Sequence, residues 1–151
     1  MLNIRIICVG KLKERFYTDA ANEYLKRLAG YCKPEIVELP ESRFELALDK
    51  ERAAIEQKLP AGALTVALCL EGEALSSHGL SKLLSDNAGR GVSRICFIIG
   101  GSNGLHEEIK NKADINLSLS KMTFPHNLAR VILLEQLYRA FNIIEGGKYH
   151  K

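Results

Sequence analysis

The residues best suited to chemistry gather in the last third of the chain. An apolar run, RICFIIG (residues 94–100), opens into the turn GGSNGLH (100–106), and a second run, INLSLS (115–120), leads into KMTFPHNLARV (121–131). Glycine-rich turns that follow apolar strands bind nucleotide-like ligands in α/β proteins, because no side chain blocks the approach to the backbone. Two such junctions, followed by a long helical segment and a charged end, favour an enzyme site over a bare scaffold.

The turn GGSNG matches neither common phosphate-binding motif. The dinucleotide-binding pattern G-x-G-x-x-G requires a glycine two positions before Gly101, where the chain has Ile99. A Walker loop is excluded because the sequence contains no G-K-[ST]. Taken alone, the turn is as compatible with a plain strand-to-helix connection as with a ligand site. Its position beside a second junction favours a ligand.

The second junction offers both hydroxyl and apolar groups. Its residues are Leu119, Ser120, Lys121, Met122, Thr123 and Phe124. The hydroxyls and the turn backbone could hydrogen-bond an adenine edge, while the apolar side chains could face its ring. The alternative is an ordinary helix start, in which Thr123 caps the helix and Pro125 occupies its first turn. Residue types alone leave both interpretations open.

Five apolar runs predict the strands that must position these junctions, and the segments between them predict helices. We expect strands at residues 3–9, 34–39, 64–70, 94–99 and 115–119, and helices at 14–28, 44–59, 80–87, 106–112 and 125–144. Because the runs are continuously apolar and alternate with helices, we predict an α/β fold. It consists of a mainly parallel five-stranded sheet with helices on both faces, in one domain spanning residues 1–151. The charged stretch 40–58 is interpreted as a solvated helix or loop without a catalytic role.

The final helix is apolar over much of its circumference. One apolar face is formed by Val131, Leu134, Tyr138 and Phe141, and a second by Leu133, Leu137, Ala140 and Ile144. Two such faces require two packing partners, which we predict to be the sheet and a second copy of the chain. The alternative is that one subunit buries both faces. Glu135, Arg139 and Asn142 line a further face, interpreted as a polar network at the dimer seam.

The overall composition is that of an ordinary globular protein, with 46% hydrophobic and 26% charged residues and a net charge of only +3. A non-specific nucleic-acid binder would usually be more basic, so any RNA contact must come from a local patch. Basic residues cluster at Lys11, Lys13 and Arg15 and again at Lys26 and Arg27. Each alone is typical solvated charge, whereas together they could guide an RNA backbone. No RNA-recognition signature with interleaved aromatic residues is identified.

The cysteines and the amino-terminal segment indicate where the protein works. Cys8, Cys32, Cys69 and Cys96 form no C-x-x-C pair and have no histidine at metal-ligand spacing, which predicts reduced thiols and no metal. The first ten residues are too strand-like for a signal peptide, and no apolar stretch reaches the ~20 residues of a membrane span. We expect a cytoplasmic protein without a membrane or metal partner.

Several motifs together resemble one protein family. GGSNGLH (100–106), LSLSKMTFPHNLARVILLEQLYRAF (117–141) and the terminal YHK (149–151) are similar to the RlmH (YbeA-like) family of SPOUT methyltransferases. Shorter similarities lie in VGKLKERF (9–16), EYLKRL (23–28) and LEGEALSSHGL (70–80). The resemblance runs from end to end and is weakest at residues 41–60.

This resemblance implies a C-terminal trefoil knot, a homodimer through the last helix, and S-adenosylmethionine as methyl donor. The implied reaction methylates N3 of a pseudouridine in 23S ribosomal RNA. The chain has no room for a separate RNA-binding domain, so the implied substrate is the assembled ribosome. Carried over by motif, the cofactor-binding residues are Leu68, Gly100, Gly101, Leu119, Ser120, Lys121, Met122, Thr123 and Phe124.

The acceptor defines what else such a site must contain. The N3 of a pseudouridine carries a proton at neutral pH, so the site requires a base or a cation that stabilises the developing anion. His126 and Arg130 are candidates because they lie four residues apart on one helix face beside the second junction. A histidine at a helix start is also often structural, so its role stays open.

The end of the chain supplies the other catalytic candidates, Tyr149, His150 and Lys151. They follow Gly146 and Gly147, a pattern typical either of a frayed end or of a hinged flap. The resemblance favours a flap over the bound nucleotide, in which Tyr149 stacks on a base and Lys151 contacts phosphate.

Two other classes of function are compatible with parts of the sequence. One is a non-catalytic RNA- or ribosome-binding module on the same fold. The other is a Rossmann- or flavodoxin-like oxidoreductase, which the missing glycine fingerprint disfavours. Binding of S-adenosylhomocysteine would separate the methyltransferase from both.

Overall fold

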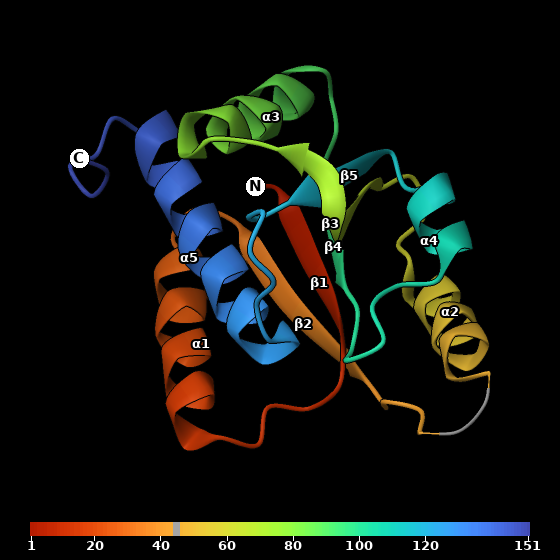
Figure 1. Ribbon diagram of the computed structural model, residues 1–151. Helices are drawn as coiled ribbons and strands as arrows, with labels where there is room; N and C mark the ends of the chain where they lie inside the picture. Colours follow the sequence, from red (N-terminus) through yellow and green to blue (C-terminus); the bar gives the residue numbers. More distant parts are fainter. Residues whose placement is uncertain (44–45) are drawn as a thin grey trace.

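A five-stranded parallel sheet runs through the middle of the computed structural model, which describes residues 1–43 and 46–151 (Figure 1). The strands are β1 (Asn3–Val9), β2 (Lys33–Leu39), β3 (Leu64–Ala74), β4 (Arg94–Ile99) and β5 (Ile115–Ser118). They lie in the order β2-β1-β4-β3-β5, and each neighbouring pair is parallel. The predicted five-stranded parallel sheet is therefore confirmed.

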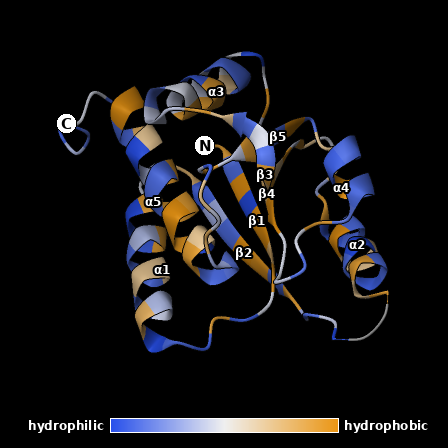
Figure 2. Ribbon diagram, viewed as in Figure 1, coloured by the Kyte–Doolittle hydropathy of each residue, from blue (hydrophilic) through white to orange (hydrophobic). Residues whose placement is uncertain are grey.

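Helices cover both faces of this sheet, as the continuously apolar strands require. One face carries α1 (Arg15–Leu28), α3 (Ser77–Gly89) and α5 (His126–Ile144), and the other carries α2 (Ala47–Lys58) and α4 (Glu107–Lys112) (Figure 1). Figure 2 shows hydrophilic and hydrophobic residues mixed along the helices, as expected where one side of a helix packs on a sheet and the other meets water. Among residues 1–43 and 46–151, no helix is long and apolar enough to cross a membrane.

Three predicted boundaries differ from the structure for identifiable reasons. The helix predicted from residue 44 is observed from Ala47, and residues 44–45 lie outside the described part of the chain. Helix α3 begins before the predicted residue 80, because the Ser76 side chain accepts the Gly79 N–H at 2.9 Å and caps the helix. Strand β3 continues to Ala74 because, after a register shift, its end pairs again with β5. A Cβ at Gly72 would lie 2.7 Å from the Asn116 carbonyl carbon, so glycine permits this close approach.

The expected cap of α5 is wrong. Pro125, not Thr123, is the last residue before the helix, and no side chain caps the helix start. Pro125 has an extended ψ of 140°, so it stands outside the first turn rather than within it. Thr123 is therefore available to the loop that precedes the helix.

The premise that α5 needs a second chain to cover its apolar faces is also wrong. Helix α5 lies between α1 and α3 on the sheet, so neighbours within one chain cover most of its circumference (Figure 1). Leu133, Leu134, Leu137 and Ala140 are completely buried, and of the apolar residues named for the two faces only Ile144 is exposed, at 40%. Most of the apolar surface of α5 is therefore buried within one subunit, which was the alternative to a dimer in the sequence-based prediction.

Three of the four cysteines behave as expected for buried apolar residues. Cys8, Cys32 and Cys96 are buried and free, and burial raises the pKa of the Cys8 thiol to about 11. Such thiols stay protonated at neutral pH and are unreactive. Cys69 is only half-buried, since it lies where β3 leaves the core.

Candidate active site

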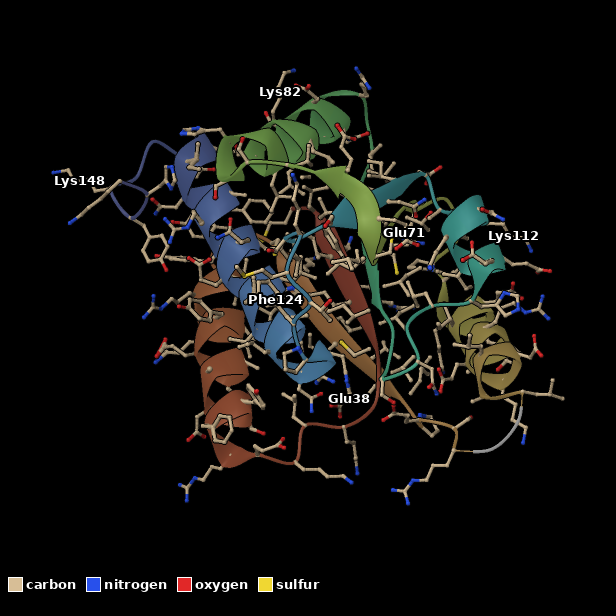
Figure 3. All side chains as sticks on the ribbon, viewed as in Figure 1. Glu38, Glu71, Lys82, Lys112, Phe124 and Lys148 are labelled. Carbon is tan, nitrogen blue, oxygen red and sulfur yellow. The ribbon has the colours of Figure 1, made fainter. Side chains whose placement is uncertain are left out.

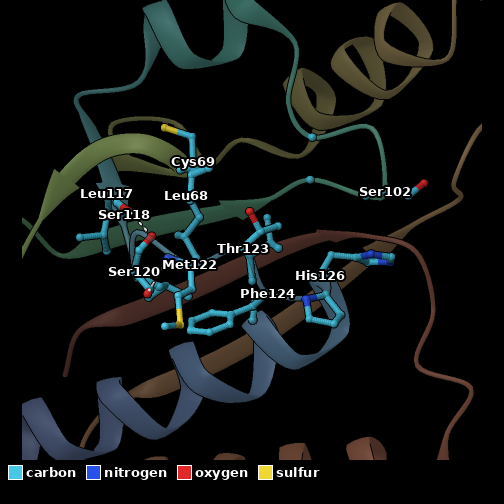
Figure 4. Close-up of a pocket in the computed structure, with 18 residues that line it drawn as sticks. Leu68, Cys69, Ser102, Leu117, Ser118, Ser120, Met122, Thr123, Phe124 and His126 are labelled. Carbon is cyan, nitrogen blue, oxygen red and sulfur yellow. Dashed lines mark hydrogen bonds between the residues drawn. The ribbon is translucent and has the colours of Figure 1, made fainter.

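A cavity of about 560 Å³ opens beside the middle of β3 and the ends of β4 and β5 (Figure 4). Three chain segments form its walls: the middle of β3, the glycine turn after β4, and the loop from β5 to α5. Parallel strands place their carboxyl ends at one edge of a sheet, where ligands of α/β proteins bind. The volume lies within the 300–1,000 Å³ common for small-molecule sites.

The cavity brings together almost the whole predicted cofactor set. Its lining includes Leu68, Gly100, Gly101, Leu119, Ser120, Met122, Thr123 and Phe124, whereas Lys121 does not line it. The sequence analysis missed further lining residues, among them Cys69, Ser102, Leu117, Ser118 and Ala129. Cys69, Ser102, Leu117 and Ser118 could have been predicted from the sequence, because each is next to, or within two residues of, a predicted cofactor-binding residue.

The glycine turn after β4 folds tightly onto itself. The Gly104 N–H donates to the Gly101 carbonyl at 3.0 Å, and a Cβ at Gly100 would lie 2.3 Å from the Gly104 carbonyl oxygen. Only glycine fits at position 100. The turn therefore presents backbone rather than side chains to the cavity.

Gly101 makes room for a neighbouring loop. A Cβ at this position would meet Glu41 Oε1 at 2.8 Å and Val9 Cγ1 at 3.1 Å. Any side chain at position 101 would therefore press on the β2–α2 loop behind the turn.

Glu41 fixes the position of the glycine turn from this loop. Its Oε1 accepts the Ser102 backbone N–H at 2.8 Å and also the Ser102 hydroxyl. These hydrogen bonds hold the pKa of the Glu41 carboxyl below its usual value, so the group is ionised at neutral pH. The expectation that stretch 40–58 has no part in the site is therefore wrong for Glu41.

The loop from β5 to α5 is shaped by its own hydroxyl groups. The Ser118 hydroxyl donates to the Ser120 carbonyl at 2.9 Å, and the Ser120 hydroxyl accepts the Met122 N–H at 2.9 Å (Figure 4). Met122 is 74% exposed, and Phe124 is half-buried. An exposed thioether and a phenyl ring at the wall of a cavity can cover a flat aromatic ligand.

His126 and Arg130 separate into two roles. His126 is the first residue of α5, is half-buried and lines the cavity. Arg130 is buried, donates to Glu38 Oε2 at 2.7 Å and to the Gly10 carbonyl at 3.0 Å, and does not line the cavity. Arg130 therefore fastens α5 to the ends of β1 and β2 and so positions His126.

The chain end is folded against α5 rather than free. The Tyr149 hydroxyl donates to Glu135 at 3.0 Å, its N–H donates to the Asn142 side chain at 3.0 Å, and His150 lies 3.0 Å from Arg139. Burial, with hydrogen bonds to Tyr24 and Glu135, raises the pKa of Tyr149. The expectation that Gly146 and Gly147 leave the tail uncoupled from the helix is wrong for the isolated chain.

This docking places the tail far from the cavity of its own chain. Helix α5 has 19 residues, which corresponds to about 28 Å at 1.5 Å per residue. Figure 3 shows Lys148 at one end of α5 and Phe124 near the other. Tyr149, His150 and Lys151 therefore do not join His126 within one chain.

The two basic clusters are also separated. Lys11, Lys13 and Arg15 stand at the start of α1, at the cavity end of the molecule. Arg27 lies near the end of α1, with its guanidinium 5.5 Å from the Tyr138 ring centre, on the tail side. Within residues 1–43 and 46–151, no three His, Cys, Asp or Glu side chains gather to hold a metal ion.

Comparisons with known proteins define the class to which this fold and cavity belong. The profile of one family, described as "predicted SPOUT methyltransferase", matches residues 2–150. The structure is similar to that of a probable methylase family protein from Haemophilus influenzae Rd KW20, with a TM-score of 0.59 and 15% identity. That match covers 99% of this chain and 71% of the other, and it shows the fold alone.

Curated relatives narrow the class. Proteins named "Ribosomal RNA large subunit methyltransferase H" are 46% identical in Clostridioides difficile (strain 630) and 48% identical in Clostridium novyi (strain NT). Each match covers 99% of this chain and 100% of the relative. The chain belongs to the RlmH family of SPOUT methyltransferases, as the motif resemblance predicted.

Proposed function

We propose that this protein is a cytoplasmic enzyme that methylates N3 of a pseudouridine in 23S ribosomal RNA, with the assembled ribosome as substrate and S-adenosylmethionine as methyl donor. The observation that carries the proposal is the cavity, which gathers the family's cofactor motif from three separate segments of the chain. The names of the relatives support ribosomal RNA as the substrate class. The pseudouridine and its N3 atom come from the motif resemblance.

The residues present fit an adenosine-like sulfonium cofactor. The backbone of Gly100 and Gly101 lines the cavity, where it would face the ribose and methionine portion. Leu68, Leu119, Met122 and Phe124 would cover the adenine, with Ser120 and Thr123 beside them. Lys121 is exposed and does not line the cavity. We propose that it contacts RNA or the methionine carboxylate from the rim of the cavity. When bound, the cofactor supplies an electrophilic methyl group with a neutral thioether as leaving group, and no metal is required.

The residues of the chain itself act on the acceptor nucleotide. We propose that His126, at the cavity wall, accepts the N3 proton or hydrogen-bonds the acceptor base. Arg130 positions this histidine through Gly10 and Glu38 rather than touching the substrate. Holding the acceptor in line with the methyl group supplies the rest of the rate enhancement.

We further propose a homodimer through α5, in which each tail serves the partner's cavity. Tail and cavity stand at opposite ends of α5, so an antiparallel pair of these helices would bring each tail to the other chain's cavity. Ile144, 40% exposed, and half-buried Tyr138 offer apolar surface for such contact. There, Tyr149, His150 and Lys151 would orient the nucleotide and neutralise phosphate.

A trefoil knot is part of the same proposal, for a single domain covering residues 1–151. The loop from β5 to α5, the middle of β3 and the glycine turn after β4 share one cavity. A chain end threaded between two such segments would hold the cofactor from three sides.

Calorimetry with S-adenosylhomocysteine tests the proposed function. We expect one site per chain, and we expect Gly100→Ala to abolish binding, because the added Cβ would collide with the Gly104 carbonyl. Gly89→Ala, at the end of α3, serves as the control, since nothing lies within 4 Å of a Cβ there and its φ is not positive. A wild-type protein that binds unmethylated ribosomes but not S-adenosylhomocysteine would contradict the proposal and favour a non-catalytic RNA-binding module.

A further inference from the structure

The start of α1 exposes a large aromatic side chain that the core does not use. Phe16 is 66% exposed, and its ring centre lies 4.4 Å from that of Tyr17, with the planes tilted by 54°. Apart from this contact with Tyr17, most of the Phe16 side chain faces solvent. Phe16 is thus available for contact with something outside the chain.

Exposed cations surround this phenyl ring in the sequence. Lys11 and Lys13 precede the helix, Arg15 is its first residue, and all three are exposed. Arg15 lies 3.7 Å from Asp19, but both side chains are more than two-thirds exposed, so the pair adds little stability. Among the residues described, Lys11 and Lys13 form no ion pair, and Glu14 and Asp19 are the acidic residues of this segment.

These cations do not serve the helix either. The amino end of a helix carries the positive end of its dipole, where an acidic residue stabilises and a basic one does not. Helix α1 has no acidic residue in its first turn, begins with Arg15, and has no side-chain cap. The acidic residue at this end is the N-cap, Glu14, so the three cations add nothing to the stability of the helix.

The segment is held firmly next to the cavity. Gly10, where it begins, accepts a hydrogen bond from Arg130 at 3.0 Å, and a Cβ there would lie 3.4 Å from His126 Nε2. The Leu12 N–H donates to Glu38 at 3.2 Å, and the Leu12 side chain packs on the core. In Figure 3, Glu38 marks this end of the sheet. Phe16 therefore lies six residues along the chain from a glycine that is next to His126.

We propose that Phe16, with Lys11, Lys13 and Arg15, binds a single-stranded RNA nucleotide that flanks the methylated one. The phenyl ring stacks on the base, which suits any base because each has an aromatic face. The cations pair with the neighbouring phosphates. This inference rests on the proposed function, since it supplies the substrate contact that a small methyltransferase without an RNA-binding domain needs.

RNA fits this surface better than a second copy of the chain. The buried centre of a protein–protein interface is depleted of lysine, whereas here two lysines and an arginine lie within six residues of sequence around the ring. Polyanion phosphates complement that charge. Phe16 adds one aromatic face to this basic segment, because its side chain is exposed instead of joining the core.

Binding to purified, unmethylated large ribosomal subunits tests the stacking contact. We expect Phe16→Leu, which keeps an apolar side chain but removes the aromatic face, to weaken binding about ten-fold or more. Phe16→Trp should bind as tightly as wild type. Calorimetry with S-adenosylhomocysteine and sedimentation should give wild-type values for both variants. Unchanged ribosome affinity in Phe16→Leu, or a loss of dimer instead of RNA binding, would overturn the inference.

The charged part of the contact has its own test. Replacing Lys11 and Lys13 by Ala should lower the slope of log K against log salt by roughly 1.4, about 0.7 for each lost phosphate contact. Replacing Lys50 and Lys58, exposed lysines of α2 on the opposite face of the sheet, is the matched control and should leave the slope unchanged. Equal slopes for both double variants would overturn the phosphate contacts.

Photocrosslinking identifies the partner directly. A benzophenone amino acid in place of Phe16 should crosslink to 23S ribosomal RNA near the target nucleotide, and crosslinking to a second copy of the chain would overturn the inference. The two proposals fail separately. If the wild type shows no methyl transfer while Phe16 still crosslinks to RNA, the proposed function fails and this contact stands. If the wild type is active and Phe16→Leu binds normally, only this contact fails.

Discussion

At the scale of single residues, the glycine turn depends on a carboxylate from another part of the chain. Gly100 and Gly101 allow the turn to form, but the Ser102 N–H and hydroxyl need an acceptor, and Glu41 supplies it. The same carboxylate leaves no room for a side chain at Gly101. The proposed cofactor site is therefore built from two sides, with the glycines in the cavity lining and the Glu41 carboxylate behind them.

We predict that Glu41→Ala weakens S-adenosylhomocysteine binding about five-fold, because hydrogen bonds worth about 1 kcal/mol no longer fix the turn. Glu41→Gln keeps an oxygen acceptor and should recover most of the affinity. Calorimetry measures both, with Glu145→Ala, an exposed glutamate after α5, as control. Wild-type affinity in Glu41→Ala would show that the turn holds its shape unaided.

The charge of Glu41 gives the same contact a pH dependence. The folded pKa of this carboxyl is lowered, so its stabilisation is complete above the unfolded value of about 4.3 and is lost as pH falls through the folded pKa. The difference in unfolding free energy between wild type and Glu41→Gln should therefore shrink below about pH 4. Urea titrations at several pH values measure it, and a difference that stays constant to pH 3 would contradict the ionised role.

At the scale of elements, sequence patterns predicted what local physics determines. The apolar run of β4 predicted a buried strand, and the glycines after it predicted a turn beside a ligand site. Both predictions were possible because a buried parallel strand and a tight turn need those residue types. Contacts between distant segments were not predictable. Glu41 and Ser102 are 61 positions apart, and Tyr149 docks on Glu135 through side chains that show no periodic pattern. The coverage of α5 was misjudged because the apolar faces of a helix do not reveal which neighbours pack on them.

The packing of α5 predicts different losses at two positions one turn apart. Arg130→Met should lower the free energy of unfolding by about 2–3 kcal/mol, since it leaves Glu38 and the Gly10 carbonyl without their donor. His126→Ala should leave stability within about 0.5 kcal/mol but reduce methyl transfer. Urea unfolding and a transfer assay on each variant separate the two effects. A destabilised His126→Ala with a normal rate per folded molecule would contradict this division.

At the scale of the whole molecule, the separation of tail and cavity is the reason for proposing a pair of chains as the active unit. Each chain carries its cavity at one end of α5 and Tyr149, His150 and Lys151 at the other. The basic residues are divided in the same way, with Lys11 and Lys13 at the cavity end of the molecule and Arg27 at the tail end. An antiparallel dimer would gather both sets around one nucleotide.

Mixed dimers test this arrangement. A chain lacking residues 149–151 and a chain carrying Gly100→Ala should each be inactive alone, with sedimentation showing that both still dimerise. Co-refolded, they should regain activity, because the intact cavity of the first meets the intact tail of the second. No recovery in confirmed mixed dimers would show that the tail acts within its own chain or not at all.

The most direct test of the central claim is methyl transfer itself. Tritium-labelled S-adenosylmethionine is incubated with the wild-type protein and ribosomes that lack the modification, and the nucleosides of the 23S ribosomal RNA are then separated. We predict that label appears in a single nucleoside, 3-methylpseudouridine. We also predict that Gly100→Ala abolishes it and that Gly89→Ala does not. Absence of label with a wild-type protein that binds S-adenosylhomocysteine, or label in another nucleoside, would contradict the claim.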